Sequence, residues 1–242
     1  MRPQPLLPLA VDADKRYDLV ILAYQVWFLS PSLPCTSFLA SPEAARLLQG
    51  TPVVSLIGCR NMWLMAQEKV KARLQELGAR LVDNIVLTDA CGAAASFLST
   101  PLWMFTGRQK PYAWVPRAGI DEAEIVRASR FGEAMAQRLL ADRSPIERPM
   151  LTGLGAVKVD ERLIASERVG NRSFTLWSRL LSSIGPQKSR RRAVGLVLYI
   201  VFLICLILTV VPLSAVLKKL LAPLFRARIE REKAYFAGPS GE

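Results

Sequence analysis

The sequence of 242 residues contains no histidine. Triads of the Ser-His-Asp and Cys-His kinds, and zinc enzymes with an H-E-x-x-H motif, all need histidine as a base or a metal ligand. These classes are excluded, so any chemistry must depend on carboxylates, Lys, Arg, Cys, Tyr or a bound cofactor.

The chain also lacks paired cysteines and an export signal. Its four cysteines, Cys35, Cys59, Cys91 and Cys205, are far apart and form no C-x-x-C pair, which is typical of a protein in a reducing compartment. The first ten residues, MRPQPLLPLA, are too short and too interrupted by proline for a signal peptide. Both observations favour the cytoplasm.

The positive charge is concentrated near the C-terminus. The formal charge is +12, of which residues 188–242 contribute 10 Lys and Arg against 3 Asp and Glu, and residues 1–187 contribute 22 against 17. No zinc-finger spacing or RNA-recognition motif is present, so we expect no nucleic-acid partner. A basic excess around an apolar segment indicates anionic lipid headgroups instead.

One long apolar segment predicts a membrane helix. Residues 193–217 contain no charged residue, and about 20 apolar residues suffice to cross the hydrocarbon core. Lys and Arg stand on both sides of the segment, so their distribution does not decide its orientation. Because the large N-terminal part has no export signal, we expect a single-pass protein with its main domain on the cytoplasmic side.

A shorter apolar pattern precedes this segment. Phe174, Trp177, Leu181 and Ile184 recur at helical spacing, with Arg172 and Arg179 on other faces. An interfacial helix on the bilayer and a helix packed on the domain both explain the pattern, and the sequence leaves the two open.

Alternating strands and helices predict an α/β domain. Continuous apolar runs at residues 17–24, 52–58 and 80–88 are typical of parallel strands covered on both faces. Helices are expected at 43–49, after the N-cap Ser41, at 62–77, ending before Gly78, and at 121–140. This order predicts an open parallel sheet with right-handed crossovers.

The predicted organisation has five parts. An irregular segment (1–16) precedes the α/β domain (17–145). A linker and basic juxtamembrane segment (146–192) follows the domain, and after it come the transmembrane helix (193–217) and a basic tail (218–242).

Ligands of open parallel sheets bind beyond the carboxyl ends of the strands. We therefore single out the loops at 25–28, 59–63 and 89–96. In the first, Trp27 and Phe28 suit stacking on a planar ring, although two aromatics packed under the next helix would give the same pattern. The third loop is rich in small residues, which allow a ligand to approach closely but also serve simple turns.

The second loop offers polar and cationic groups. Gly58, Arg60, Asn61 and Trp63 stand at the start of a helix, where free N–H groups and a guanidinium suit an anionic ligand. Arg60 would equally pair with Asp89 or Glu68. Cys59 is a candidate thiol or a small buried side chain. Asp89, Tyr24 and Cys59 are the candidates for acid–base roles.

The run LIGCRNMWLMAQE (56–68), together with YDLVILAYQVWF (17–28), resembles the bacterial dialkylresorcinol condensing enzymes, a flavodoxin-like family. The resemblance implies FMN as cofactor, with its ring against Gln25, Val26, Trp27, Phe28 and the loop Gly58, Cys59, Arg60, Asn61 and Trp63. It also implies the bacterial cytoplasmic membrane, oxidation of a lipid-tailed cyclic dione to an aromatic ring, and a ketosynthase or acyl-carrier partner.

The chain departs from this family at its start. No strand and no loop for the FMN phosphate precede residue 17, so the predicted flavodoxin-like sheet is N-terminally incomplete and strand 17–24 has an unpaired apolar edge. Either the start is truncated, which we favour, or the domain is a degenerate relative. The hypotheses are thus an anchored FMN oxidoreductase and a cofactor-free, partner-binding subunit.

Overall fold

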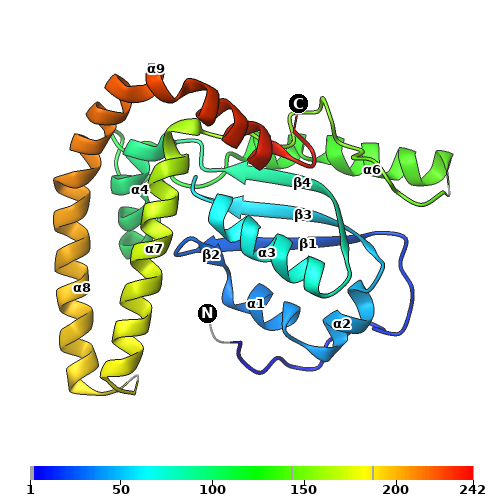
Figure 1. The fold of residues 1–242 in the computed structure, drawn as a ribbon, viewed down its shortest axis with the longest axis horizontal. Coiled ribbons are helices and arrows are strands. Elements are labelled where there is room, and N and C mark those ends of the chain that lie inside the picture. The colour runs from blue at the N-terminus through cyan, green and yellow to red at the C-terminus, as the bar shows by residue number, and fades with distance from the viewer. Residues whose placement is uncertain (1–2, 143, 187, 242) are drawn as a thin grey trace. The chain divides into compact units, whose positions relative to one another are not determined.

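The computed structural model describes residues 3–142, 144–186 and 188–241, and it divides into two units (Figure 1). Unit 1 comprises Met1–Val159 and Ala234–Glu242, and unit 2 comprises Asp160–Lys233. The elements are, in order, β1 (Val20–Trp27), β2 (Ser30–Pro31), α1 (Leu33–Leu39), α2 (Pro42–Leu48), β3 (Pro52–Cys59), α3 (Leu64–Glu76), β4 (Arg80–Thr88), α4 (Gly92–Thr106), α5 (Glu122–Arg127), α6 (Ser129–Ala141), α7 (Glu161–Ile184), α8 (Arg190–Leu208) and α9 (Val210–Ala237).

Unit 1 is an α/β structure, as the sequence predicts. Its four-stranded sheet has the order β2-β1-β3-β4, in which β1, β3 and β4 are parallel. The sheet is mixed, because the short β2 runs antiparallel to β1. The predicted strands 52–58 and 80–88 match β3 and β4, whereas β1 begins three residues later than predicted, at Val20.

The local signals for helices hold where they are strongest. The Ser41 side chain accepts a hydrogen bond from the Ala44 N–H and caps α2, and Gly78, after α3, has a φ of 68° that a residue with a Cβ adopts rarely. The predicted helix 121–140 is divided at Ala128 into α5 and α6. Helices α1 and α4 were not predicted.

Helix α3 covers one face of the sheet through a buried chain of polar groups (Figure 1). The Tyr24 hydroxyl donates to Gln67 Oε1, and Gln67 Nε2 donates to Ser55 Oγ at 2.9 Å. Ser55 Oγ in turn donates to Asn84 Oδ1 at 2.9 Å. These bonds join α3 to β1, β3 and β4 and pair the side-chain oxygens and the Gln67 amide, although the buried Asn84 Nδ2 has no hydrogen-bond partner.

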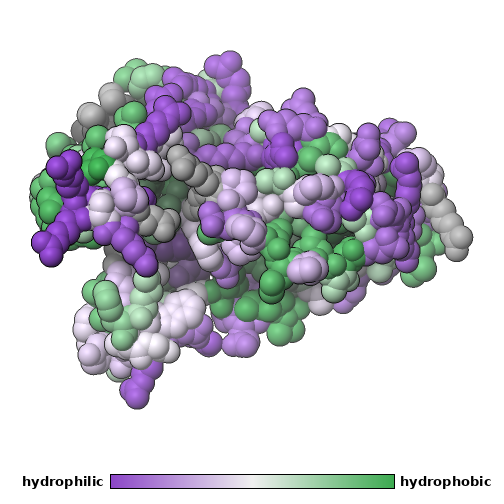
Figure 2. Space-filling model, turned by 90° about the horizontal axis from the view of Figure 1, so that it is seen from below, coloured by the Kyte–Doolittle hydropathy of each residue, from purple (hydrophilic) through white to green (hydrophobic). Residues whose placement is uncertain are grey.

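The opposite face is only partly covered. Phe131 and Met135 of α6 pack in one buried cluster with Val54, Val82 and Ile85 of β3 and β4. The same face of β1 is open, and Ile21 is 52% exposed. The prediction that strand 17–24 is covered on both faces is therefore wrong, because the packed cluster formed by α6 involves β3 and β4 but not β1. Figure 2 shows such hydrophobic residues reaching the surface in patches among hydrophilic ones.

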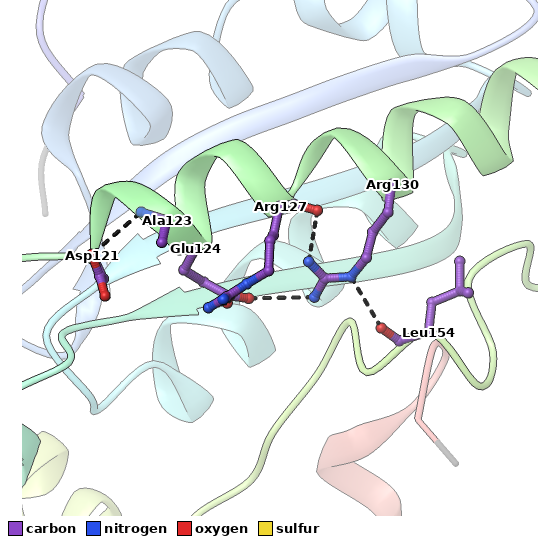
Figure 3. Close-up of polar contacts among 6 residues, drawn as sticks. All are labelled: Asp121, Ala123, Glu124, Arg127, Arg130 and Leu154. Carbon is purple, nitrogen blue, oxygen red and sulfur yellow. Dashed lines mark hydrogen bonds and ion pairs between the residues drawn. The ribbon is translucent and has the colours of Figure 1, made fainter.

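Ion pairs hold the start of α6 in place (Figure 3). Glu124 on α5 accepts hydrogen bonds from Arg127 at 2.7 Å and from Arg130 at 3.3 Å. The Arg127 bond, the largest cause, lowers the pKa of the Glu124 carboxyl. Arg130 also donates to the carbonyl of Leu154, so α6 is tied to the segment that runs along β4.

The two edges of the sheet differ. On the β4 edge, Asp83 accepts from the N–H groups of Met150 at 2.7 Å and Leu151 at 3.2 Å. Ser240 Oγ donates to Asp83 at 2.7 Å and accepts from the Asn84 N–H, so the C-terminal segment lies beside β4 (Figure 1). On the other edge, residues 20–24 of β1 pair with β3 alone among the described residues, whereas the Gln25 carbonyl accepts from the Ser32 N–H at 2.8 Å.

Residues 218–242, predicted as a basic tail, include the end of a helix and a segment that groups with unit 1. Helix α9 continues to Ala237, and residues 234–242 belong to unit 1. Phe236 and Ser240 are 3% and 2% exposed, and Tyr235 donates to Glu68 at 2.7 Å. Sequence patterns do not reveal this return, because its contacts lie more than 150 residues away along the chain.

Unit 2 contains one helical stretch, Arg190–Ser214, that is long and apolar enough to cross a membrane. It begins three residues before the predicted segment 193–217 and is divided after Leu208, where α8 ends and α9 follows. Helix α8 packs on α7, with the Trp177 ring centroid 5.1 Å from that of Tyr199 and 5.2 Å from that of Phe202.

The buried carboxylate at the β4 edge gives a first prediction. We expect Asp83→Asn to lower the free energy of unfolding by roughly 1–3 kcal/mol. Asp83 accepts backbone N–H groups with both carboxylate oxygens, whereas Asn has one oxygen and an NH₂ group, so one of these N–H groups would lose its acceptor. Thermal unfolding of the full chain in detergent, followed by circular dichroism, measures the change. The exposed Asp14→Asn is the matched control. An unchanged melting temperature in Asp83→Asn would contradict the assigned role.

Candidate functional site

The structure brings the first two predicted loops together at the carboxyl ends of β1 and β3. Gln25 and Gly58 are directly paired across the parallel strands, and Cys59 pairs with Thr88 at the end of β4. The predicted loops at 25–28, 59–63 and 89–96 therefore lie at the ends of three neighbouring strands, but they are shorter than predicted, because residues 25–27 belong to β1, Cys59 to β3 and residues 92–96 to α4. We call this region the carboxyl edge.

The first loop is a tight turn that exposes two aromatic side chains. Trp27 pairs with Ser30 across the turn, and Phe28 and Leu29 between them have φ values of 50° and 55°. Bulky residues rarely adopt this left-handed conformation, and such strain persists where the surroundings impose it. Lys69 on α3 does so here, since its ammonium donates to the Leu29 carbonyl at 3.2 Å and to Ser30 Oγ at 2.7 Å.

The aromatic pair does not pack under the next helix. Trp27 is 42% exposed and Phe28 is 69% exposed. The indole N–H of Trp27 donates to Gln25 Oε1 at 3.1 Å, and Val26 pairs with Pro31 in the turn. The sequence-based alternative of two buried aromatics is therefore not observed, and both rings remain accessible to a ligand.

The second loop divides into an accessible part and a buried one. Gly58, Cys59, Arg60 and Asn61 are half-buried, and the side chain of Ile120 approaches Gly58 closely. Trp63 is 2% exposed at the start of α3, so it serves packing and offers no surface to a ring.

Arg60 is the cation of the carboxyl edge. Its Nε donates to the buried Ser96 Oγ of α4. Burial lowers the pKa of its guanidinium, while the nearby Asp89 and Cys91 act in the opposite direction. Of the two predicted partners, Asp89 is close enough to interact with this charge, whereas Glu68 pairs with Lys71 at 3.1 Å.

In the third loop, Asp89 has a structural role. One carboxylate oxygen accepts from the Cys91 N–H at 2.9 Å, and the other accepts from the Gly119 N–H at 3.0 Å. Gly119 has a φ of 102°, which residues with a Cβ rarely adopt, and an added Cβ would meet Gln109 Nε2 at 3.3 Å, so the position favours glycine. Ser96 lies within the predicted segment 89–96, whereas the contributions of Gly119 and Ile120 were not foreseen, because they come from a segment that reaches the edge only in the folded chain.

Of the other two candidates for acid–base roles, Cys59 is half-buried at the end of β3, and Tyr24 is buried with its hydroxyl engaged. Burial raises the pKa of the Tyr24 hydroxyl well above its usual value, and this hydroxyl donates to Gln67. Burial also raises the pKa of the Cys91 thiol, which lies 3.2 Å from Ser99 Oγ. The described residues contain no group of three or more acidic or cysteine side chains arranged for a metal ion.

Two cavities lie elsewhere on unit 1. One of about 470 Å³ is lined by residues 144–150 and Arg138, and one of about 170 Å³ is lined by residues from 13–16 and 46–51. Neither contains a residue of the three carboxyl-edge loops. The features of the carboxyl edge that suit a ligand are therefore the exposed aromatic turn and Arg60.

Comparison of the chain with protein-family models, curated proteins and solved structures found no match. The fit of FMN is therefore tested on the residues. Trp27 and Phe28 are exposed aromatic side chains, which is the kind of group on which an isoalloxazine ring stacks. The phosphate does not fit in the same way, because described residues 3–19, which precede β1, form neither a strand nor a helix and provide no loop that would cradle it.

The buried thiols give a second prediction. Burial raises the pKa of Cys35 to about 12, so at pH 8 very little of it is thiolate, and we expect almost no alkylation by iodoacetamide. Cys91, whose pKa is raised less, is expected to react faster than Cys35 but slower than in the unfolded chain. Peptide mass spectrometry over a pH series, with urea-unfolded protein as control, measures both rates. Equal rates for Cys35 in the folded and unfolded chain would contradict this environment.

Proposed function

We propose that the protein is a membrane-bound, flavodoxin-like flavin oxidoreductase that holds its ring at the carboxyl edge. The observation that carries the proposal is the strained turn that presents Trp27 and Phe28 beside the end of β3. Conformational strain imposed by the Lys69 contacts on an exposed aromatic turn favours a binding role over a packing role.

The proposed chemistry needs no histidine. Conversion of a cyclic dione to an aromatic diol removes two electrons and two protons, and a flavin, when bound, supplies the electron acceptor. The resemblance in residues 17–28 and 56–68 supports a lipid-tailed dione as the substrate. An apolar helix that keeps the domain at a bacterial membrane would hold the site close to such a substrate.

The site supports ring binding more than phosphate binding. Arg60 is the cation of the carboxyl edge, and it is already bonded to Ser96. We therefore expect FMN and riboflavin to bind with similar affinity, in contrast to a site whose main contacts are to the phosphate.

The third prediction concerns the aromatic turn. In the purified full chain, Trp27→Ala is expected to weaken riboflavin and FMN binding roughly tenfold, because stacking of a planar ring on an aromatic side chain contributes about 1–3 kcal/mol. Quenching of flavin fluorescence during titration measures the affinity. Tyr17→Ala, at the opposite end of the same strand region, is the matched control.

Two outcomes would count against flavin binding at this turn. One is the absence of quenching in the unaltered chain, and the other is equal loss of affinity in Trp27→Ala and Tyr17→Ala. A strong preference for FMN that disappears in Arg60→Gln would instead place the phosphate at Arg60.

A second candidate function is a cofactor-free, partner-binding subunit. The open edge of β1 at residues 20–24 and the exposed Ile21 favour it, because an unpaired apolar edge pairs readily with another chain. An acidic acyl-carrier protein suits the basic charge of this chain. Slower amide exchange in β1 on addition of purified acyl-carrier protein would support this candidate, and unchanged exchange would reject it.

A further inference from the structure

The chain leaves unit 1 at Val159 and rejoins it at Ala234. The rejoining segment is anchored by buried contacts, since Ser240 Oγ bonds to the Asp83 carboxylate and to the Asn84 N–H. The Tyr235 hydroxyl donates a hydrogen bond to Glu68, and the Lys71 ammonium nitrogen lies 5.1 Å from the centroid of the Tyr235 ring. Both ends of unit 2 are therefore attached to the same folded unit.

This attachment conflicts with a single membrane crossing. If the stretch Arg190–Ser214 crossed the bilayer once, residues 215–242 would lie on the opposite side from Asp83. A return crossing would have to use residues 215–233, which include Arg226, Arg228, Glu230, Arg231, Glu232 and Lys233. Each charged residue at the centre of the bilayer is costly, so this segment cannot return through the hydrocarbon core.

The contacts of unit 2 suggest how its apolar surface is used. One side of α8 packs on α7, where Gly195 lies so close to Leu181 and Ile184 that an added Cβ would meet them at 3.0 and 3.2 Å. The remaining surface of α8 is apolar and open. Its exposed residues include Val194, Val197, Leu198, Val201, Ile204 and Leu208.

Helix α7 is amphipathic. Val169, Leu176 and Leu180 lie on one flank and are each at least 49% exposed, while Arg172 and Arg179 lie on another flank. The α7–α8 hairpin therefore combines an apolar surface with a polar one. This combination is typical of helices that lie at the bilayer interface.

The charge of this region identifies the kind of lipid. Residues 168–229 contain 11 Lys and Arg and no Asp or Glu. Lys188, Arg190 and Arg191 are exposed at the turn between α7 and α8. Clusters of this kind are attracted to anionic headgroups.

We propose that the α7–α8 hairpin enters one leaflet only, with α8 against the acyl chains and the 188–192 turn among anionic headgroups. The protein is then monotopic, and residues 1–159 and 226–242 lie on the same side of the membrane. This inference rests on the membrane association in the proposed function but not on flavin binding.

The fourth prediction tests the topology with two cysteine reporters in one full chain, Glu133→Cys on α6 and Arg231→Cys on α9, both at exposed positions. We expect a membrane-impermeant maleimide to label both in inverted membrane vesicles and neither in intact cells, with mass spectrometry separating them from the native thiols. Labelling of position 231 from the outside and of position 133 from the inside would overturn the monotopic arrangement. A chain that does not sediment with membranes would overturn the membrane association as well.

The headgroup contact has its own test. In flotation with phosphatidylglycerol vesicles, replacement of Arg190, Arg191 and Arg192 by Gln is expected to lower partitioning roughly 100-fold, while phosphatidylcholine vesicles show little difference. Replacement of Arg108, Arg148 and Lys158 by Gln removes the same charge from exposed positions of unit 1 and is the control. Equal losses in the two triple variants would overturn the assignment of the 188–192 turn to headgroups.

Discussion

The fold of unit 1 depends on one buried carboxylate at the edge of its sheet. Asp83 accepts two backbone N–H groups from the segment at 150–151 and a hydroxyl from Ser240. Burial raises the pKa of this carboxyl although all three hydrogen bonds act to lower it. Two distant parts of the chain therefore meet at a single group whose burial is tolerable only while its partners are present.

This interaction also explains the asymmetry of the sheet. The β4 edge is covered because the segment at 150–156 and the C-terminal residues bond to it, which leaves its N–H groups satisfied. No comparable cover lies along residues 20–24 of β1 among the described residues. An exposed edge next to an exposed aromatic turn makes this side of unit 1 the place where a ligand or a partner would gain most by binding.

The sequence predicts the parts of the fold that depend on local patterns. Local patterns correctly predict strands β3 and β4, the cap at Ser41 and the end of α3 before Gly78, because apolar runs and capping residues act over a few positions. At the carboxyl edge, the pairing of Gln25 with Gly58 follows from the parallel order. Three features could not be predicted, because they depend on which distant elements pack there in the folded chain. These are the exposed face of β1, the bond from Arg60 to Ser96 and the burial of Trp63.

The apolar helical stretch Arg190–Ser214 shows the same limit most clearly. Hydropathy measures the length of an apolar helix and says nothing about where the chain goes next. In this protein, the chain after the apolar stretch returns to unit 1, where the Ser240 hydroxyl is buried and donates to Asp83. If the apolar stretch enters a bilayer, a contact of 2.7 Å in unit 1 constrains the path of this segment more than 25 residues earlier, because a chain cannot be on both sides of a bilayer without crossing it. Topology in such a protein is therefore a property of its tertiary contacts as much as of its apolar residues.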